Sequence, residues 1–343
     1  MSQVRLSVTP LEDRTTPSVA APYAVGVAAG ETGDAVVYAA DGTESYRVAA
    51  PYGSAFTGGV RVTLADVTGD GTADLVTAPG AGTAPTINVY DGADPAHALV
   101  ASFNAFEASF TGGVNVAAAD ITGDGFAEVV AGADLGGGPR VVVFDGATIG
   151  GTATPATLAD FLAIDDSHFR GGVRLALGDI GGDGTADLLV GAGFGGGPRV
   201  AVYNGATILS GITRLFNDFF VFEQTLRNGV YVTGGDLDGD GFADLIFGGG
   251  PGGGPRVLAL SGTGLLAGQG AGSPVLANFF AGDDRNRGGV RVVAKDTDGD
   301  GRAEIFTGGG EGESGKVHKF RGNGQQDNAF DDDFGGNTGV FVG

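Results

Sequence analysis

The sequence predicts an all-β protein, a closed six-bladed β-propeller built from four-stranded antiparallel blades. Two observations lead to this prediction. A strand that begins with a Gly-Val pair occurs six times along the 343 residues, and a short turn ending in glycine also occurs six times. Recurrence at a period of about 57 residues is the mark of a repeat architecture, in which each repeat is one supersecondary unit.

The spacing of the two landmarks predicts that the repeats close into a ring. The glycines before valine are separated by 54, 59, 57, 60 and 50 residues, and the turn glycines by 50, 54, 59, 57 and 60. The second series is the first one read from another starting point, so the chain begins part-way through a blade that its last residues must complete. The first series is Gly59, Gly113, Gly172, Gly229, Gly289 and Gly339, and the second is Gly42, Gly92, Gly146, Gly205, Gly262 and Gly322.

Each repeat contains four segments with the character of a strand. A GGVRV-type segment is followed by a short apolar run such as ADLVTA, a β-rich segment such as PRVVVF, and a Phe-rich stretch such as ANFFA. Alternating or β-branched runs of this length favour strands. Asp-Gly and Asn-Gly between the third and fourth segments predict hairpin turns, because both residues tolerate positive φ. The phenylalanines are expected to pack between blades.

The termini are expected to share one blade. Residues 1–21 form an N-terminal leader in this prediction, and residues 22–343 form the propeller. The N-terminal part of the propeller supplies three strands of the shared blade, and TGVFVG (Thr338–Gly343) supplies the innermost strand. This pairing removes exposed strand edges, which otherwise template aggregation.

Five repeats carry a nine-residue acidic loop between the first and second strands. Positions 1, 5 and 9 are carboxylates, position 6 is glycine, and the last two loops add Asp at position 3. Such spacing directs several oxygens toward one point, as a hard cation with six to eight oxygen ligands requires, so we predict up to five Ca²⁺ ions. The predicted ligands, with position 7 contributing its carbonyl oxygen, are Asp66, Thr68, Asp70, Thr72 and Asp74; Asp120, Thr122, Asp124, Phe126 and Glu128; Asp179, Asp183, Thr185 and Asp187; Asp236, Asp238, Asp240, Phe242 and Asp244; and Asp296, Asp298, Asp300, Arg302 and Glu304.

The five loops are expected to bind calcium with different affinity. Loops four and five offer four carboxylates each, loops one and two have Thr68 and Thr122 at position 3, and loop three has Gly181 there. Affinity rises with the number of charged ligands, so the expected order is loops four and five, then one and two, then three. For a single loop, a solvated Asp-Gly turn is the alternative interpretation.

The loops and their flanking strands resemble FG-GAP/VCBS-type repeats. The unit FTGGVRVTLADVTGDGTADLVTAPG, from Phe56 to Gly80, is similar to the repeats of the integrin α-chain propeller and of related bacterial proteins. The resemblance implies a calcium-binding propeller with a role in interaction or adhesion. The chain departs from integrin propellers in having six repeats rather than seven.

Composition narrows the classes of partner. The 41 acidic and 19 basic residues leave a formal net charge of −22, which opposes binding to nucleic acid. No apolar run approaches the roughly 20 residues of a membrane helix, so no membrane insertion is expected. The segment from Val4 to Ser18 resembles an LEDR-type segment of exported bacterial repeat proteins, and we expect a monomer that is secreted or held at the cell surface.

No catalytic constellation stands out in the sequence. The three histidines lie at unrelated positions of their repeats, and there is no Cys. The sequence therefore favours a module that binds a protein or glycan ligand, through loops opposite the acidic ones, over an enzyme. The alternatives are a polysaccharide lyase or hydrolase and a purely structural scaffold. Repeated arginines on the first strand (Arg61, Arg174, Arg291) are expected to pair with acids or carbonyls between blades, and an anionic ligand on the axis is the alternative.

Overall fold

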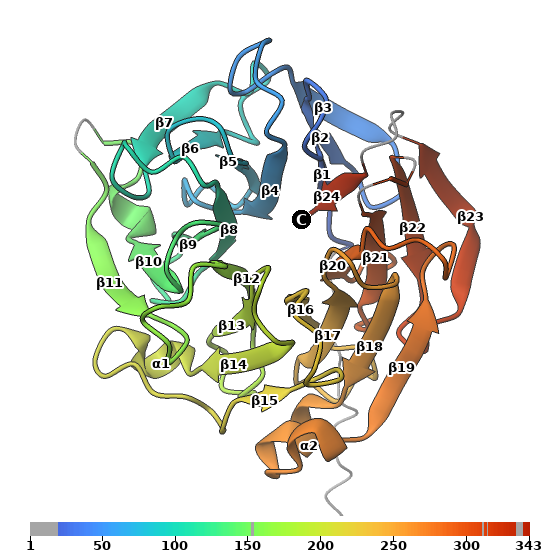
Figure 1. Cartoon of the computed structure of the whole chain (residues 1–343). Helices are drawn as coiled ribbons and strands as arrows, with labels where there is room; N and C mark the ends of the chain where they lie inside the picture. Colours follow the sequence, from blue (N-terminus) through green and yellow to red (C-terminus); the bar gives the residue numbers. More distant parts are fainter. Residues whose placement is uncertain (1–19, 152–153, 311, 314, 334–338) are drawn as a thin grey trace, which may run out of the picture.

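The predicted fold is confirmed. The structure, a computed structural model, describes residues 20–151, 154–310, 312–313, 315–333 and 339–343. In these residues, six four-stranded antiparallel sheets stand around a central axis (Figure 1). No helix in the described residues is long and apolar enough to cross a membrane. Of the expected leader, residues 1–19 lie outside the described part of the chain.

Each blade runs from an innermost strand beside the axis to an outermost strand at the rim (Figure 1). We number the blades 1 to 6 by innermost strand. Blade by blade, the strands are β4 (Val60–Ala65), β5 (Asp74–Pro79), β6 (Thr86–Tyr90), β7 (Leu99–Asn104); β8 (Val114–Ala119), β9 (Glu128–Ala133), β10 (Arg140–Phe144), β11 (Thr157–Leu162); β12 (Val173–Gly178), β13 (Asp187–Ala192), β14 (Arg199–Tyr203), β15 (Phe219–Phe220); β16 (Val230–Gly235), β17 (Asp244–Gly249), β18 (Arg256–Leu260), β19 (Val275–Phe280); β20 (Val290–Lys295), β21 (Glu304–Gly309), β22 (Lys316–Phe320), β23 (Gln326–Asp333); and β24 (Val340–Val342), β1 (Tyr23–Val27), β2 (Ala35–Tyr38), β3 (Glu44–Val48).

The shared terminal blade closes the ring as predicted. β24 pairs antiparallel with β1, with Val342 opposite Val25. Buried side chains of this blade pack against both neighbours: Val36 lies in one cluster with Phe306 of blade 5, and Val37 in another with Leu75 of blade 1. The pairing therefore removes two strand edges and also completes two interfaces between blades.

The glycine before each innermost strand is required by the backbone. All six of these glycines have φ between 68° and 99°, a left-handed region that favours glycine. They also approach the preceding blade closely: a Cβ on Gly172 would lie 2.3 Å from the carbonyl oxygen of Ala133, and one on Gly229 would lie 2.4 Å from that of Ala192. The first landmark of the sequence thus marks the contact between neighbouring blades.

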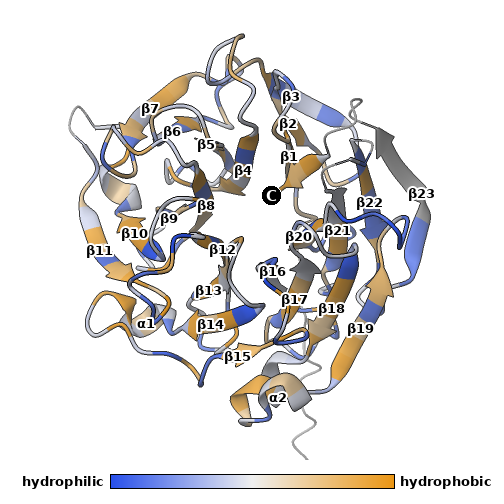
Figure 2. Ribbon diagram, viewed as in Figure 1, coloured by the Kyte–Doolittle hydropathy of each residue, from blue (hydrophilic) through white to orange (hydrophobic). Residues whose placement is uncertain are grey.

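The hydrophobic core is divided among the interfaces between blades. One cluster joins Val76 and Val89 of blade 1 to Val116 and Val129 of blade 2. Figure 2 shows many strands in hydrophobic colours, and the second strands β5, β9 and β13 are buried along their whole length. The expectation that phenylalanines pack between blades holds for Phe144 and other buried rings, whereas several phenylalanines described below are exposed.

The prediction of hairpin turns at the Asp-Gly and Asn-Gly pairs is wrong for two blades, and a third blade, which has Ser-Gly, shares their geometry. In these, the residue before the glycine caps a short helix: Asp145 precedes η1 (Gly146–Thr148), Asn204 precedes α1 (Gly205–Ile208) and Ser261 precedes α2 (Gly262–Leu266). Side-chain oxygens of Asp, Asn and Ser accept backbone N–H groups at helix starts as readily as they favour turns. A tight turn does occur at Gly42, whose φ is 87°. A further short helix, η2, covers Gly270–Gly272.

Candidate cation-binding loops

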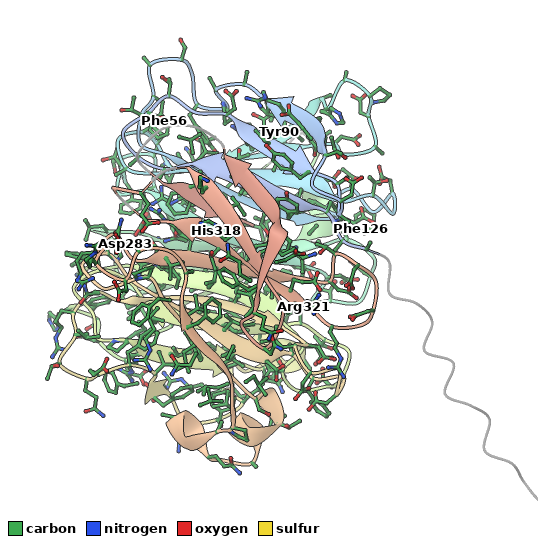
Figure 3. The ribbon with its side chains drawn as sticks, turned by 90° about the vertical axis from the view of Figure 1, so that its right-hand side faces the viewer. Phe56, Tyr90, Phe126, Asp283, His318 and Arg321 are labelled. Carbon is green, nitrogen blue, oxygen red and sulfur yellow. The ribbon has the colours of Figure 1, made fainter. Side chains whose placement is uncertain are left out.

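All five acidic loops lie on one face of the ring. They join the innermost strand of blades 1 to 5 to the second strand, and the turns after the third strands lie beside them. We call this the acidic face, and the side with the remaining connections the opposite face. Figure 3 shows them at opposite edges of the molecule, with Phe126 and Arg321 on the acidic face and Phe56 and Asp283 on the opposite face.

The carboxylate at position 9 is buried and holds the loop together. In loop 4, Asp244 has no exposed surface and accepts the backbone N–H groups of Leu237 (2.8 Å) and Gly262 (3.0 Å). The bond from position 2 is made in all five loops at 2.7–3.0 Å. Position 9 therefore organises the backbone of the loop, a role that sequence reasoning had not assigned to it.

The partner that the sequence reasoning missed is the turn glycine, the second landmark. It lies 18 residues after position 9, as in Asp187 and Gly205, whose N–H donates to the Asp187 carboxylate at 2.9 Å. A Cβ on Gly205 would lie 2.1 Å from the carbonyl oxygen of Ala186. Only glycine allows the turn to approach the loop this closely. The constant 18-residue interval was the available signal.

The carboxylate at position 1 closes the loop on itself. In loop 4, Asp236 accepts the backbone N–H groups of Gly239 (2.6 Å), Asp240 (3.2 Å) and Gly241 (2.9 Å). The equivalent Asp residues of the other loops accept N–H groups from the same stretch of backbone. Positions 1 and 9 together thus satisfy most of the inward-pointing N–H groups.

Position 3 divides the loops into two kinds. In loops 4 and 5, oxygens of positions 1, 3 and 9 all lie within 4.8 Å of one another, and among the described residues these are the two groups that can hold a metal ion. They are Asp236, Asp238 and Asp244, and Asp296, Asp298 and Glu304. In loops 1 to 3 the residue at position 3 lacks a carboxylate, and its backbone N–H donates to position 9, as from Gly181 to Asp187 at 2.8 Å.

The predicted ligands at positions 5 and 7 lie outside these two groups. The position 5 carboxylates are exposed and accept the N–H of position 7, as in Asp240 with Phe242 (3.0 Å) and Asp300 with Arg302 (2.8 Å). The same bond is made in the other three loops, by Asp70 with Thr72, Asp124 with Phe126 and Asp183 with Thr185. The structure thus brings together three of the predicted carboxylates in each of loops 4 and 5. The predicted role of positions 5 and 7 as calcium ligands stays a prediction.

Crowded carboxylates make loop 4 strongly electronegative. Burial, with smaller contributions from Asp238 and Asp240, raises the pKa of Asp244 to about 6. In loop 5 the ammonium of Lys319 lies 3.3 Å from the carboxylate of Glu304 and offsets part of the negative charge. Each of the two clusters therefore has three carboxylates, but of the two only loop 4 has no direct ion pair among the described residues.

Neighbouring loops are joined across the blade interfaces. The N–H of position 8 donates to the position 1 carbonyl of the preceding loop, as from Ala303 to Asp236 at 2.6 Å. The side chain at position 7 covers the position 4 glycine of that loop: a Cβ on Gly239 would meet Arg302 at 3.0 Å, and one on Gly182 would meet Phe242 at 2.2 Å. The conformation of each loop is therefore stabilised by contacts with the loop of the next blade.

A cavity of about 510 Å³ opens between loops 4 and 5. Its walls include Asp238 of loop 4, Asp300 and Arg302 of loop 5, and Arg321 and Asn323 from the turn between β22 and β23. Carboxylates of both candidate metal groups thus share one hollow with two guanidinium groups. Such a hollow can hold a ligand that carries both negative charge and hydroxyl groups.

Comparison of the sequence with known proteins does not assign this chain to a family. No family model matches the sequence and no curated protein matches it, so the resemblance to FG-GAP repeats stays a prediction. Among solved structures, the chain is similar to the rhamnogalacturonan lyase YesW (14% identity, TM-score 0.42, 87% of this chain and 66% of that one) and to rhamnogalacturonan lyase PL11 of Bacillus licheniformis (14%, 0.41, 90% and 66%). It is also similar to a quinonprotein alcohol dehydrogenase-like protein of Bacteroides thetaiotaomicron (10%, 0.37, 93% and 77%). The chain spans just under two thirds of the length of the lyases.

Proposed function

We propose that this protein is a calcium-stabilised β-propeller that acts outside the cell, secreted or at its surface, as a module that binds a protein or glycan. The observation that carries the proposal is the meeting of three carboxylates in each of loops 4 and 5. Carboxylate oxygens, with no Cys and no His among them, are the ligands of a hard cation. Calcium suits these loops better than magnesium, because it accepts irregular geometry and bidentate carboxylates.

Calcium binding can be tested by titration calorimetry of the wild-type chain and three variants. We expect about two tighter sites per chain and the loss of one of them in Asp238→Asn and in Asp298→Asn. The control is Glu107→Gln, which removes an acid whose side chain is 70% exposed. A wild-type chain that takes up no calcium at millimolar concentration, or variants that bind as the wild type does, would refute the calcium proposal.

The opposite face has the character of a binding surface. Of the ten exposed large apolar side chains in the described residues, six lie there, at the ends of outermost strands or in the loops of that face. They are Leu135, Leu162, Phe194, Phe220, Leu226 and Phe280. A cavity of about 380 Å³ on this face is lined in part by Phe220, Arg199 and Arg227. Exposed apolar groups beside arginine are enriched in surfaces that bind proteins and sugars.

This face can be tested with glycan and matrix-protein arrays in the presence of calcium. We expect a ligand whose binding is lost in the double variant Phe194→Ser/Phe220→Ser. The control is Leu266→Ser, which removes an apolar side chain next to the acidic face that is about as exposed as Phe220. Equal loss in the control, or a ligand that binds the double variant normally, would contradict the placement of the binding surface.

The cavity between loops 4 and 5 supports a second candidate, an enzyme acting on acidic polysaccharides. A cation beside Arg302 and Arg321 can bind a sugar carboxylate and stabilise its negative charge, and Asp300, which lies outside the two carboxylate groups, can accept a proton. The test is incubation with rhamnogalacturonan and calcium, followed by the ultraviolet absorbance of unsaturated sugar ends and by reducing-sugar release. Cleavage by the wild type that is lost in Arg321→Ala would favour the enzyme proposal. No cleavage by the wild type would exclude rhamnogalacturonan as the substrate.

A further inference from the structure

A ring of six side chains surrounds the axis of the propeller near the opposite face. Each comes from the second residue of an innermost strand, or from the residue equivalent to it, and all six line one cavity of about 70 Å³. Every innermost strand contributes, and these strands surround the middle of the ring in Figure 1, so the cavity lies on the axis. The members of this axial ring are Arg61, Asn115, Arg174, Tyr231, Arg291 and Phe341.

Arginine occupies every second place in the axial ring. Arg61, Arg174 and Arg291 come from blades 1, 3 and 5, with Asn, Tyr and Phe between them. The three guanidinium groups therefore have an approximate threefold arrangement within a six-bladed ring. Aromatic rings fill two of the three gaps: the guanidinium of Arg174 lies 4.0 Å from the ring centre of Tyr231, and that of Arg291 lies 4.4 Å from the ring centre of Phe341.

The arginines are only partly satisfied by the protein. Arg61 pairs with Asp134, which agrees with the structural role expected from the sequence. Arg174 and Arg291 each donate to a main-chain carbonyl oxygen, of Ala192 (3.5 Å) and Gly309 (2.5 Å), and neither forms an ion pair with a described acid. Among the described residues, the Nε of Arg291, in a residue 8% exposed, has no hydrogen-bond partner, and Nε and Nη1 of Arg61 have none either.

The charges of the axial ring do not cancel. In the described part of the chain, the three guanidinium groups have one ion-paired carboxylate, Asp134, which leaves an excess of two positive charges in a protein whose net charge is −22. The effect reaches Tyr231: burial by itself would raise the pKa of its hydroxyl, but Arg174 and Arg291 outweigh burial and the pKa is lowered. Burying unpaired positive charge is costly, and an anion on the axis would offset that cost.

We propose that the axial ring binds one small tetrahedral oxyanion of the sulfate or phosphate class. Three arginines on alternate blades can each face one oxygen of such an ion, and guanidinium groups donate to oxyanions through paired N–H groups. The small cavity fits a free ion or the end group of a larger ligand. This site lies apart from the acidic loops and is independent of the calcium proposal.

The probe is radiolabelled inorganic sulfate, measured by equilibrium dialysis, because sulfate remains soluble beside low millimolar calcium. We expect one saturable site per chain, with affinity at least tenfold weaker in Arg174→Gln and in Arg291→Gln. The control Arg256→Gln removes a half-buried arginine at the start of a third strand, where it stacks on Phe222, and should bind as the wild type does. Absence of saturable binding, or equal binding in all variants, would overturn the proposal.

A variant with the opposite effect separates binding from a purely structural role. Asp134→Asn removes the carboxylate that pairs with Arg61, so we expect several-fold tighter binding of sulfate; weaker or unchanged binding would count against the site.

If the arginine variants do not fold, a wild-type crystal soaked in selenate decides by its anomalous signal. A peak on the axis supports the proposal, and a peak only elsewhere overturns it. Competition by O-phosphoserine would show that the site also accepts a group carried on a larger molecule, and failure to compete would restrict it to free ions.

Discussion

Loops 4 and 5 share a backbone frame with loops 1 to 3 but differ from them at position 3. In all five, the carboxylates at positions 1 and 9 accept backbone N–H groups and shape the turn. In loops 1 to 3 the N–H of position 3 also donates to position 9, whereas in loops 4 and 5 an Asp side chain joins the other two carboxylates. A repeated acidic motif can therefore be a structural element everywhere and a candidate metal site in only some copies.

Removal of the position 9 carboxylate, which holds the backbone of each loop, should have the largest effect on stability. We expect Asp187→Ala and Asp244→Ala each to lower the free energy of unfolding by about 3 kcal/mol even with a chelator present, because each leaves at least two buried N–H groups without an acceptor. Urea denaturation measures both. A loss under about 1 kcal/mol for Asp187→Ala would show that loop 3 does not depend on this frame, and the comparison would fail.

Removal of calcium should have the next largest effect. Each occupied site adds roughly 2.7 kcal/mol when free calcium is about 100 times its dissociation constant, and less for millimolar sites. A chelator should therefore lower the Tm of the wild type, but should leave the Tm of Asp238→Asn/Asp298→Asn unchanged. In calcium, Asp236→Ala should lower stability more than Asp179→Ala. The reverse order would mean that counting carboxylates is the wrong guide.

A single substitution should convert loop 1 into a loop of the kind seen in loops 4 and 5, with a carboxylate at position 3. Thr68→Asp places a carboxylate at position 3, between Asp66 and Asp74, where the backbone N–H of Thr68 donates to Asp74 (2.8 Å). We expect one additional calcium per chain and a gain of about 1 kcal/mol in calcium, with no gain in a chelator. Thr68→Asn is the control of similar size. An unchanged calcium stoichiometry would show that position 3 does not by itself decide which loops bind metal.

The smallest expected effect separates loop 4 from loop 5. Lys319→Met removes the ammonium that lies 3.3 Å from Glu304 while keeping most of the apolar stem. Without this competing cation, the calcium affinity of loop 5 should rise a few fold, which corresponds to less than about 1 kcal/mol. Calorimetry of Lys319→Met in the Asp238→Asn background isolates loop 5. Weaker binding would mean that Lys319 positions Glu304 rather than competing with the ion.

Much of the architecture was predictable because the repeats recur at a phase that only a ring satisfies. The six blades, the strand order and the pairing of β24 with β1 follow from the glycine intervals. The short helices after Asn204 and Ser261 were missed, because the same residues favour turns and helix starts. The hydrogen bond between Asp187 and Gly205 was missed because these residues lie 18 positions apart. One belongs to the acidic loop and the other to the glycine turn, and neither motif by itself indicates that the two lie in contact.

The sequence by itself determined which residue types recur in which order, and hence the fold, the closing blade and the five acidic loops. Only the tertiary structure decided that the carboxylates of positions 1, 3 and 9 meet in loops 4 and 5, and that position 5 stays outside these groups. Only it placed three arginines from alternate blades around one axial cavity. The physical reason is that strand periodicity and turn chemistry act over a few residues, whereas the convergence of side chains depends on how separate blades pack.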